Sequence, residues 1–297
     1  MTAATIAARP VPPSHTKRTL ALVAVGLVVA WAAITIGVDA AEILELPAGV
    51  ALVFREMFLD PGPDWTYLPT AIEGMVESLQ IAWVGTVIGA ILSLPLGFFG
   101  AKNVSSGLVS NIIRQLLNAI RAFPEIVLAI AIFIPIAGLG PVAGALAIGI
   151  HSVGTLGKLT AEVIEGIDPG PVEAARAAGG RSLQIQRWGV LPQVLPEIIA
   201  FWLYRFEINI RAAAVLGVVG AGGIGFSLQQ TITFHRYPLA GTAIIVVVVA
   251  TIAVDTVSGW VRRRIIEGVG TGPSAGDVIE EPALVGIGAG RTDSAAG

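Results

Sequence analysis

The sequence predicts an all-α, polytopic helical membrane protein with about six transmembrane helices. Two observations support this fold class. Of the 297 residues, 54% are hydrophobic and only 13% are charged, whereas about 25% of the residues in a soluble domain are charged. The hydrophobic residues also gather in runs of roughly 20, which is the length that a helix needs to cross the hydrocarbon core of a bilayer. Most of the chain is therefore expected to lie in lipid.

Six segments carry these runs, in the order 19–38, 79–100, 126–139, 142–157, a helix that begins near Val194, and 239–261. The first has no charge, and no small-residue cleavage site follows it, so we expect a retained helix and not a signal peptide. The third is short alone, and the apolar residues 116–122 are expected to extend it inward.

Lysine and arginine alternate between the connections, and such a bias sets the orientation of a membrane protein. The N-terminal tail, the connection after the second helix, the one before the fifth helix and the end of the last helix are all basic. Residues 39–69 instead carry six acidic residues and one arginine. We therefore expect both termini in the cytoplasm and residues 39–69 outside.

Composition divides the chain into four parts. Residues 1–17 and 266–297 are expected to be disordered cytoplasmic tails, because the first are rich in Ala, Pro and Thr and the second in Gly, Ser, Ala and acidic residues. Residues 18–69 hold the first transmembrane helix and an outer connection. Residues 70–265 form the main transmembrane domain.

Sequence motifs give no reason to expect an enzyme. The chain has no cysteines and three dispersed histidines, so we expect no metal site and no catalytic residues. The stretch Gly220–Gly225 fits G-x-G-x-x-G but lacks the strand before it and the acid after it that dinucleotide binding needs. Gly272–Gly276 fits G-x-S-x-G but has no histidine nearby. No phosphate loop occurs, so the chain is expected to bind no cofactor.

A charged segment at 165–192 interrupts the apolar sequence. Pro171 suits the first turn of a helix, Glu173 suits the positive end of the helix dipole, and Gly179 suits the C-terminal cap. The alanines between them favour a helix of about eight residues, too short to cross a membrane. A solvated loop would instead be rich in Ser, Asn, Gly and Pro. The pattern favours a docking helix whose small side chains let another surface approach closely.

The same segment resembles the EAA loop of ABC importer permeases, E-A-A-x3-G-x9-I-x-L-P. The matching positions are Glu173, Ala174, Ala175, Gly179, Leu191 and Pro192. Gly189 stands where the pattern has isoleucine, a departure that we interpret as harmless. The flanking stretches 121–130, 138–168, 203–225 and 254–265 resemble phosphonate ABC transporter permeases.

This resemblance implies the type I ABC importer permease fold in a prokaryotic plasma (inner) membrane. It also implies a pore formed with a second copy of the chain, cytoplasmic ATPase subunits that bind ATP and Mg, and an extracytoplasmic substrate-binding protein. In this family the EAA loop couples the pore to the ATPase. The implied substrates are phosphonates, with phosphite and phosphate as relatives. The alternatives are a permease for methionine or another small solute and an ATP-independent secondary transporter.

Ionisable residues inside spanning segments are functional candidates. Helical spacing places two sets on one face each: His151, Thr155, Lys158, Glu162 and Glu165 in the fourth helix, and Arg114, Asn118, Arg121 and Glu125 in the third. We expect each set to face the bundle or a watery cavity, although some members could be solvated helix ends. His151 is either a buried, hydrogen-bonded histidine or a contact for the substrate.

The fifth helix carries polar residues on two faces. Glu207 and Arg211 are four residues apart with the acid first, which predicts a structural ion pair. Arg205 and Asn209 lie nearly opposite, so the helix is expected to be central. Arg205 has no acid at its own helical spacing, and its planar fork suits anionic oxygens.

The expected substrate path combines these residues with a glycine-rich stretch at 217–225, which can break the fifth helix near its outer end. The candidates are Arg205, Asn209, Arg211, His151, Gly220, Gly222 and Gly223. Backbone N–H groups of the glycines could guide an anion. The alternative is close helix packing through small residues.

Overall fold

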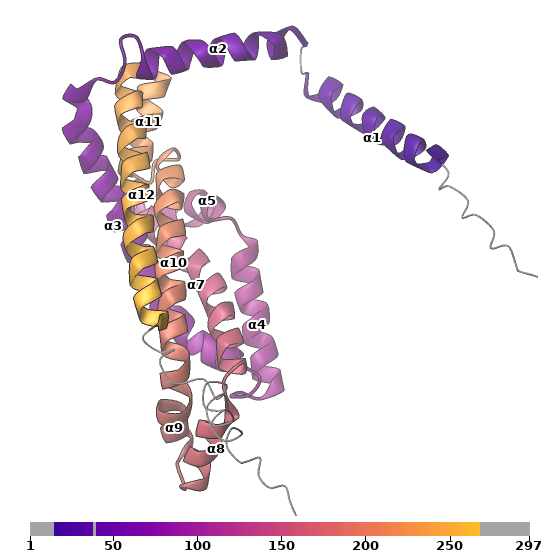
Figure 1. The fold of residues 1–297 in the computed structure, drawn as a ribbon, viewed down its shortest axis with the longest axis vertical. Helices are drawn as coiled ribbons and strands as arrows, with labels where there is room; N and C mark the ends of the chain where they lie inside the picture. Colours follow the sequence, from indigo (N-terminus) through magenta and orange to yellow (C-terminus); the bar gives the residue numbers. More distant parts are fainter. Residues whose placement is uncertain (1–14, 38–39, 268–297) are drawn as a thin grey trace, which may run out of the picture. The chain divides into compact units, whose positions relative to one another are not determined.

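The computed structural model describes residues 15–37 and 40–267, and within these ranges it contains helices and no strand. The chain divides into two units, residues 1–61 and 62–297 (Figure 1). The predicted disordered tails, 1–17 and 266–297, lie outside the described residues except at their inner ends, which continue the first and last helices.

The first unit consists of two helices, α1 (His15–Ile36) and α2 (Ala40–Phe58). As predicted, α1 is long and apolar enough to cross a membrane. The outer connection expected over 39–69 instead contains α2. The acidic residues of this segment led to the prediction of a connection. Its apolar residues nevertheless form a stripe with helical spacing, made of Leu46, Val50, Val53, Phe54 and Met57.

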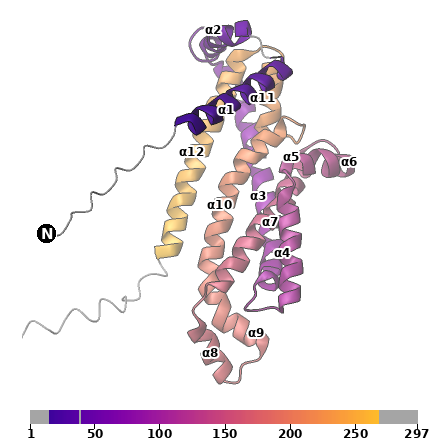
Figure 2. The same cartoon turned by 90° about the vertical axis from the view of Figure 1, so that its right-hand side faces the viewer.

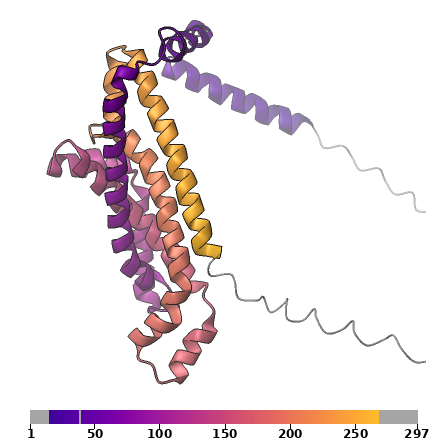
Figure 3. The ribbon, with the colours of Figure 1, turned by 60° about the vertical axis from the view of Figure 1, so that its left-hand side comes forward.

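The second unit is built from five long helices: α3 (Leu68–Gly100), α4 (Gly107–Ala122), α7 (Pro141–Glu165), α10 (Leu191–Gly217) and α12 (Tyr237–Glu267). The ribbon views show them running side by side (Figures 1 and 3). Shorter elements join them: η1 (Trp65–Tyr67), α5 (Glu125–Leu128), η2 (Ala129–Phe133), α6 (Ile134–Ala137), α8 (Pro169–Ala177), α9 (Ser182–Ile185), η3 (Gln186–Val190) and α11 (Gly223–Thr233).

The third predicted helix is not one straight span. The segment Glu125–Ala137, which comprises α5, η2 and α6, is bent by 86° from α4, and it turns away from the bundle in Figure 2. Pro124 lies at the bend, where its missing N–H and its ring disfavour a continuous helix. The expected inward extension through 116–122 is therefore wrong, because this stretch belongs to a separate helix, α4.

Among the described helices, four are long and apolar enough to cross a membrane, namely α1, α3, α7 and α12, and α4 with Glu125–Ala137 makes a fifth if this bent pair is one span. Helix α10 has 27 residues, which corresponds to about 40 Å. Its charged residues distinguish it from the other spans. Each of the six predicted segments lies largely within one of these elements, but only four or five of the described elements qualify as spans by length and hydropathy.

Glycines set the spacing between α3 and α7. On α3, Gly85, Gly89 and Gly97 recur at multiples of four residues and face α7. A Cβ at Gly89 would lie 2.6 Å from Cβ of Ser152 and 3.3 Å from the carbonyl oxygen of Gly149. At such small-residue positions helix backbones in a membrane can approach closely.

A second core lies where α3 and α7 end and α10 begins. Its buried members are Ala101, Ala161, Ile164, Val190, Val194 and Ile198. Val172 of α8 and Leu191 at the start of α10 pack against it. The short helix α8 is therefore attached to the main bundle through apolar contacts.

The glycine interface predicts a packing defect that can be measured. Gly89→Ala places a methyl group against Ser152, and overpacking of this kind costs about 1–3 kcal/mol. Gly107→Ala is the matched control, because a Cβ there has no neighbour within 4 Å. We expect Gly89→Ala to unfold at a lower temperature than Gly107→Ala in detergent, by about 2–4 °C per kcal/mol. Equal unfolding temperatures of the two variants would contradict the tight interface.

Candidate functional site

Helices α8 and α9 lie at the same end of the bundle as the α3–α4 connection and the end of α7 (Figures 1 and 3). Local sequence accounts for α8. The Asp168 carboxylate accepts a hydrogen bond from the Gly170 N–H at 2.9 Å, and prolines occupy the first turn. The chain leaves the helix through Gly179, whose φ of +76° favours glycine. The short helix expected at this place is confirmed, with nine residues.

Helix α8 packs against η3 at Gly189. This glycine is buried, and a Cβ on it would lie 3.1 Å from Cα of Val172 and 3.3 Å from the carbonyl oxygen of Pro171. An isoleucine would push the two backbones apart. The glycine that departs from the EAA pattern is therefore accommodated here by a close contact between the two backbones.

Gln193 of α10 holds the first turn of α8. Its amide oxygen accepts from the Asp168 N–H at 3.1 Å, and its amide nitrogen donates to the carbonyl oxygens of Asp168 at 3.2 Å and Gly189 at 2.6 Å. The sequence analysis did not single out Gln193. Leu191 and Pro192, which it did, form the first turn of α10.

The outer surface of α8 and α9 combines small and large apolar side chains. Ala174, Ala177 and Ala178 are exposed, and Leu183 and Trp188 are 84% and 70% exposed. Ala175 and Gly179 line a hollow together with Trp188. Glu173 and Arg176 line another cavity, of about 600 Å³, on the side that faces the bundle. Apolar side chains clustered in this way are typical of a protein-binding surface.

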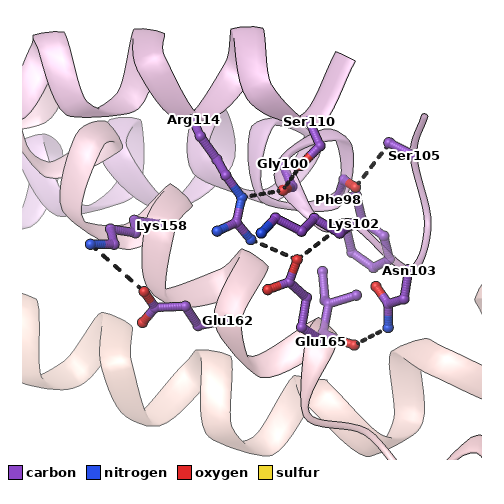
Figure 4. Close-up of polar contacts among 11 residues, drawn as sticks. Phe98, Gly100, Lys102, Asn103, Ser105, Ser110, Arg114, Lys158, Glu162 and Glu165 are labelled. Carbon is purple, nitrogen blue, oxygen red and sulfur yellow. Dashed lines mark hydrogen bonds and ion pairs between the residues drawn. The ribbon is translucent and has the colours of Figure 1, made fainter. Parts of the chain in front are cut away.

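A polar cluster joins the ends of α3, α4 and α7 beside this element (Figure 4). The Glu165 carboxylate accepts from the Lys102 N–H at 2.7 Å and pairs with Arg114 at 2.7 Å. Arg114 Nε also donates to the carbonyl oxygen of Gly100 at 2.8 Å. Asn103 Nδ2 donates to the carbonyl oxygen of Ile164 at 2.6 Å.

The two polar sets predicted on the third and fourth helices face each other, as these contacts show. Lys158 and Glu162 lie 3.8 Å apart on α7, and Asn118 of α4 lines a small cavity with Lys158. Such pairing relieves the cost of placing charges near a membrane.

Arg205 and Asn209 lie on a buried face of α10. Arg205 is 7% exposed and Asn209 is fully buried. Arg205 Nε donates to Ser152 Oγ at 3.0 Å, and Asn209 Nδ2 donates to Thr86 Oγ1 at 2.8 Å. The central position expected for this helix agrees with these contacts to α3 and α7.

The predicted ion pair between Glu207 and Arg211 is wrong. Glu207 instead lies 3.6 Å from Arg262, and Arg211 lies 3.2 Å from Asp255. Both partners belong to α12, which packs along this face of α10. Intrahelical spacing indicated which residues share a face, but an adjacent helix supplied closer partners.

His151 lies between two oxygen atoms near the start of α5. Its Nε2 lies 3.3 Å from Glu125 Oε2, and its Nδ1 lies 3.0 Å from the carbonyl oxygen of Phe123. The histidine is therefore hydrogen-bonded, which agrees with the first of its two alternatives, a buried and hydrogen-bonded histidine. Within the described ranges, no group of three or more His, Asp or Glu side chains is arranged to hold a metal ion.

The glycine-rich stretch breaks the helix as predicted, since α10 ends at Gly217 and α11 begins at Gly223. The Gly223 N–H donates to Glu77 Oε2 at 2.8 Å, and the Gly220 N–H donates to the carbonyl oxygen of Gly217 at 3.0 Å. These N–H groups are already occupied, so the predicted anion-guiding role of Gly220 and Gly223 is wrong.

The alternative, close packing, describes this stretch better. A Cβ on Gly225 would collide with the carbonyl oxygen of Ala214. Gly220, Gly222 and Gly223 all have positive φ angles, between +72° and +90°. The sequence analysis missed Glu77 because its partner lies 146 residues away.

Comparison with known proteins assigns the chain to a family. Residues 93–269 match the family model described as binding-protein-dependent transport system inner membrane component. The phosphite transport system permease protein PtxC of Stutzerimonas stutzeri is 40% identical over 68% of this chain and 74% of its own length. The phosphate-import permease protein PhnE of Mycolicibacterium smegmatis is 40% identical over 64% of this chain and 36% of its own length.

A solved structure of the MetNI methionine ABC transporter, in inward-facing conformations, has a chain that superimposes with a TM-score of 0.60 at 20% identity. The match covers 68% of this chain and 97% of that one. This similarity establishes the fold predicted from the sequence, that of a type I ABC importer permease. The family model covers more than half of the chain, and with the relatives it shows that this protein belongs to the family of binding-protein-dependent transport system inner membrane components.

Proposed function

We propose that this chain forms the translocation pore of an ATP-driven ABC importer for phosphonate or a related phosphorus oxyanion, such as phosphite or phosphate. The observation that carries the proposal is α8, a short helix fixed to two long helices and exposed at the end of the bundle. The names of the relatives at 40% identity support the substrate class. A D-methionine permease of Vibrio cholerae is more distant, at 28% identity.

In this proposal ATP and Mg bind to a separate cytoplasmic ATPase, which docks on α8 and α9. The exposed alanines of α8 allow close approach, and Leu183 and Trp188 offer apolar contact area. Movement of α8 reaches α7 and α10 because Gln193 and Gly189 hold it rigidly to the base of α10. The chain itself carries out no covalent chemistry.

The pore is proposed to contain two copies of the chain. Arg211 and Asp255 remain 49% and 43% exposed in the single chain, although both lie in long helices of the bundle. A charged pair that faced lipid would be costly. A second copy, or a watery pore between two copies, removes this cost.

The proposed orientation in the membrane rests on the basic residues at the end of the bundle that carries α8 and α9. The basic segments after α3 and around α8 lie there, and α12 runs toward this end and finishes in a basic segment (Figure 1). This end is therefore assigned to the cytoplasm together with both termini. An extracytoplasmic substrate-binding protein then delivers the substrate at the opposite end.

Uptake by the reconstituted complex tests the proposed function. The permease, its ATPase and its binding protein are placed in proteoliposomes, and uptake of phosphite, phosphate, methylphosphonate and methionine is measured with and without ATP. We expect ATP-dependent uptake of at least one phosphorus compound. Uptake of methionine alone would support the alternative, and uptake without ATP would support a secondary transporter.

A charge on the docking surface should release the ATPase. Leu183→Glu places a carboxylate in the apolar contact, and loss of a central contact weakens binding by about tenfold or more. Leu108→Glu is the matched control, because Leu108 is 73% exposed in the first turn of α4. Co-purification should lose the ATPase only in Leu183→Glu. Retention of the ATPase in both variants would place the docking surface elsewhere.

Restoring the isoleucine of the EAA pattern should impair coupling. Gly189→Ile forces α8 away from η3 through contacts with backbone atoms, so uptake per ATP should fall. Val172→Ala is the control, since it leaves the backbone contact in place. The ratio of uptake to ATP hydrolysis is measured for both. An unchanged ratio in Gly189→Ile would show that this contact does not transmit motion.

A further inference from the structure

Arg205 makes one hydrogen bond inside the bundle, and its acceptor belongs to a polar network that joins α3, α7 and α10. Its Nε donates to Ser152 Oγ of α7 at 3.0 Å. Asn209 donates to the same Ser152 oxygen at 3.2 Å and to Thr86 Oγ1 of α3 at 2.8 Å. Thr86 in turn donates to the carbonyl oxygen of Ala82 at 2.7 Å. The guanidinium group is therefore pre-positioned by buried polar side chains and does not move freely.

The two terminal nitrogens of this guanidinium group form a fork that binds no other atom among the described residues. Among the described residues, neither Nη1 nor Nη2 of Arg205 has a hydrogen-bond acceptor, and no carboxylate lies within 4.0 Å. Neither nitrogen is sealed inside the protein. An arginine in a membrane bundle without a counter-ion is costly, so a function that uses the open fork is expected.

The nearest acidic influence on Arg205 does not neutralise it. Glu125 acts on Arg205 through space, but its carboxylate contacts His151 at 3.3 Å. That carboxylate therefore has a partner of its own, and Arg205 keeps the positive charge that a guanidinium group carries in proteins.

We propose that the open fork of Arg205 binds the phosphorus oxyanion during its passage through the pore. Two parallel N–H groups match two oxygens of a tetrahedral anion, and the positive charge of the guanidinium group matches the negative charge of the ligand. Glu125 and His151 form the neighbouring wall and hold the start of α5 in place. This inference rests on the proposed function, whose substrate site it names.

Chemical rescue tests the site cleanly because the chain has no cysteines. Arg205→Cys should lower ATP-dependent uptake of phosphite, phosphate or methylphosphonate, whichever the wild type transports, by about tenfold or more. Reaction with 2-aminoethyl methanethiosulfonate restores a positive charge and should restore part of the uptake. Methyl methanethiosulfonate, which leaves a neutral group, should not. ATP hydrolysis stimulated by the loaded binding protein should persist in every case.

The controls separate this inference from the proposed function. Arg263→Gln removes an exposed arginine at the end of α12 and should transport normally. Normal uptake by Arg205→Cys, rescue by both reagents, rescue by neither, or no labelling of the cysteine would overturn the site while leaving the importer assignment intact. If Arg205→Cys does not assemble, uptake by Arg205→Lys is measured instead. Lysine keeps the charge but lacks the planar fork, so wild-type uptake by this variant would also overturn the proposed site. Absence of phosphorus uptake in the wild type would instead refute the proposed function.

Discussion

The close packing of α3 against α7 is the constraint on which both polar clusters depend. Glycines bring the two backbones together until carbonyl oxygens lie 3.0–3.3 Å from the places that Cβ atoms would occupy. Lipid chains are as apolar as leucine, so packing and hydrogen bonds of this kind hold membrane helices together. The contact fixes the register of the two helices. Thr86 and Ser152 therefore meet α10 within the bundle, and Lys102 meets Glu165 at its end.

Helix α10 divides its polar groups between two neighbouring surfaces. One face presents Arg205 and Asn209 to α3 and α7, and the other presents Glu207 and Arg211 to α12. The first face is almost fully buried, and its hydrogen bonds leave the arginine fork open. The second face keeps a half-exposed ion pair, which favours contact with a second copy or with water. Polar groups on two faces make a helix costly beside lipid, which agrees with the proposed pore between two copies.

The proposed coupling also depends on contacts between distant segments. Helix α8 begins immediately after the end of α7, where Glu165 ties α7 to α3 and α4. Its N-cap residue Asp168 is bound by Gln193 of α10, and its first turn rests on Gly189. A displacement of α8 therefore acts on α7 and α10 together. These are the two helices that supply Ser152 and Arg205, so the docking surface and the proposed anion site share the same supports.

The sequence by itself determined the apolar spans, the polar faces and the short capped helix α8, because each follows from local spacing, from proline and glycine, and from the cost of charge in lipid. It also placed Arg205 opposite Glu207 on α10. Only the tertiary structure decided the partners, since these depend on how helices rotate and approach. Arg211 pairs with Asp255, 44 residues away along the chain, and the Gly223 N–H donates to Glu77, 146 residues away. Neither distance along the chain leaves a periodic signal, and the need for Gly189 appears only when α8 lies against η3.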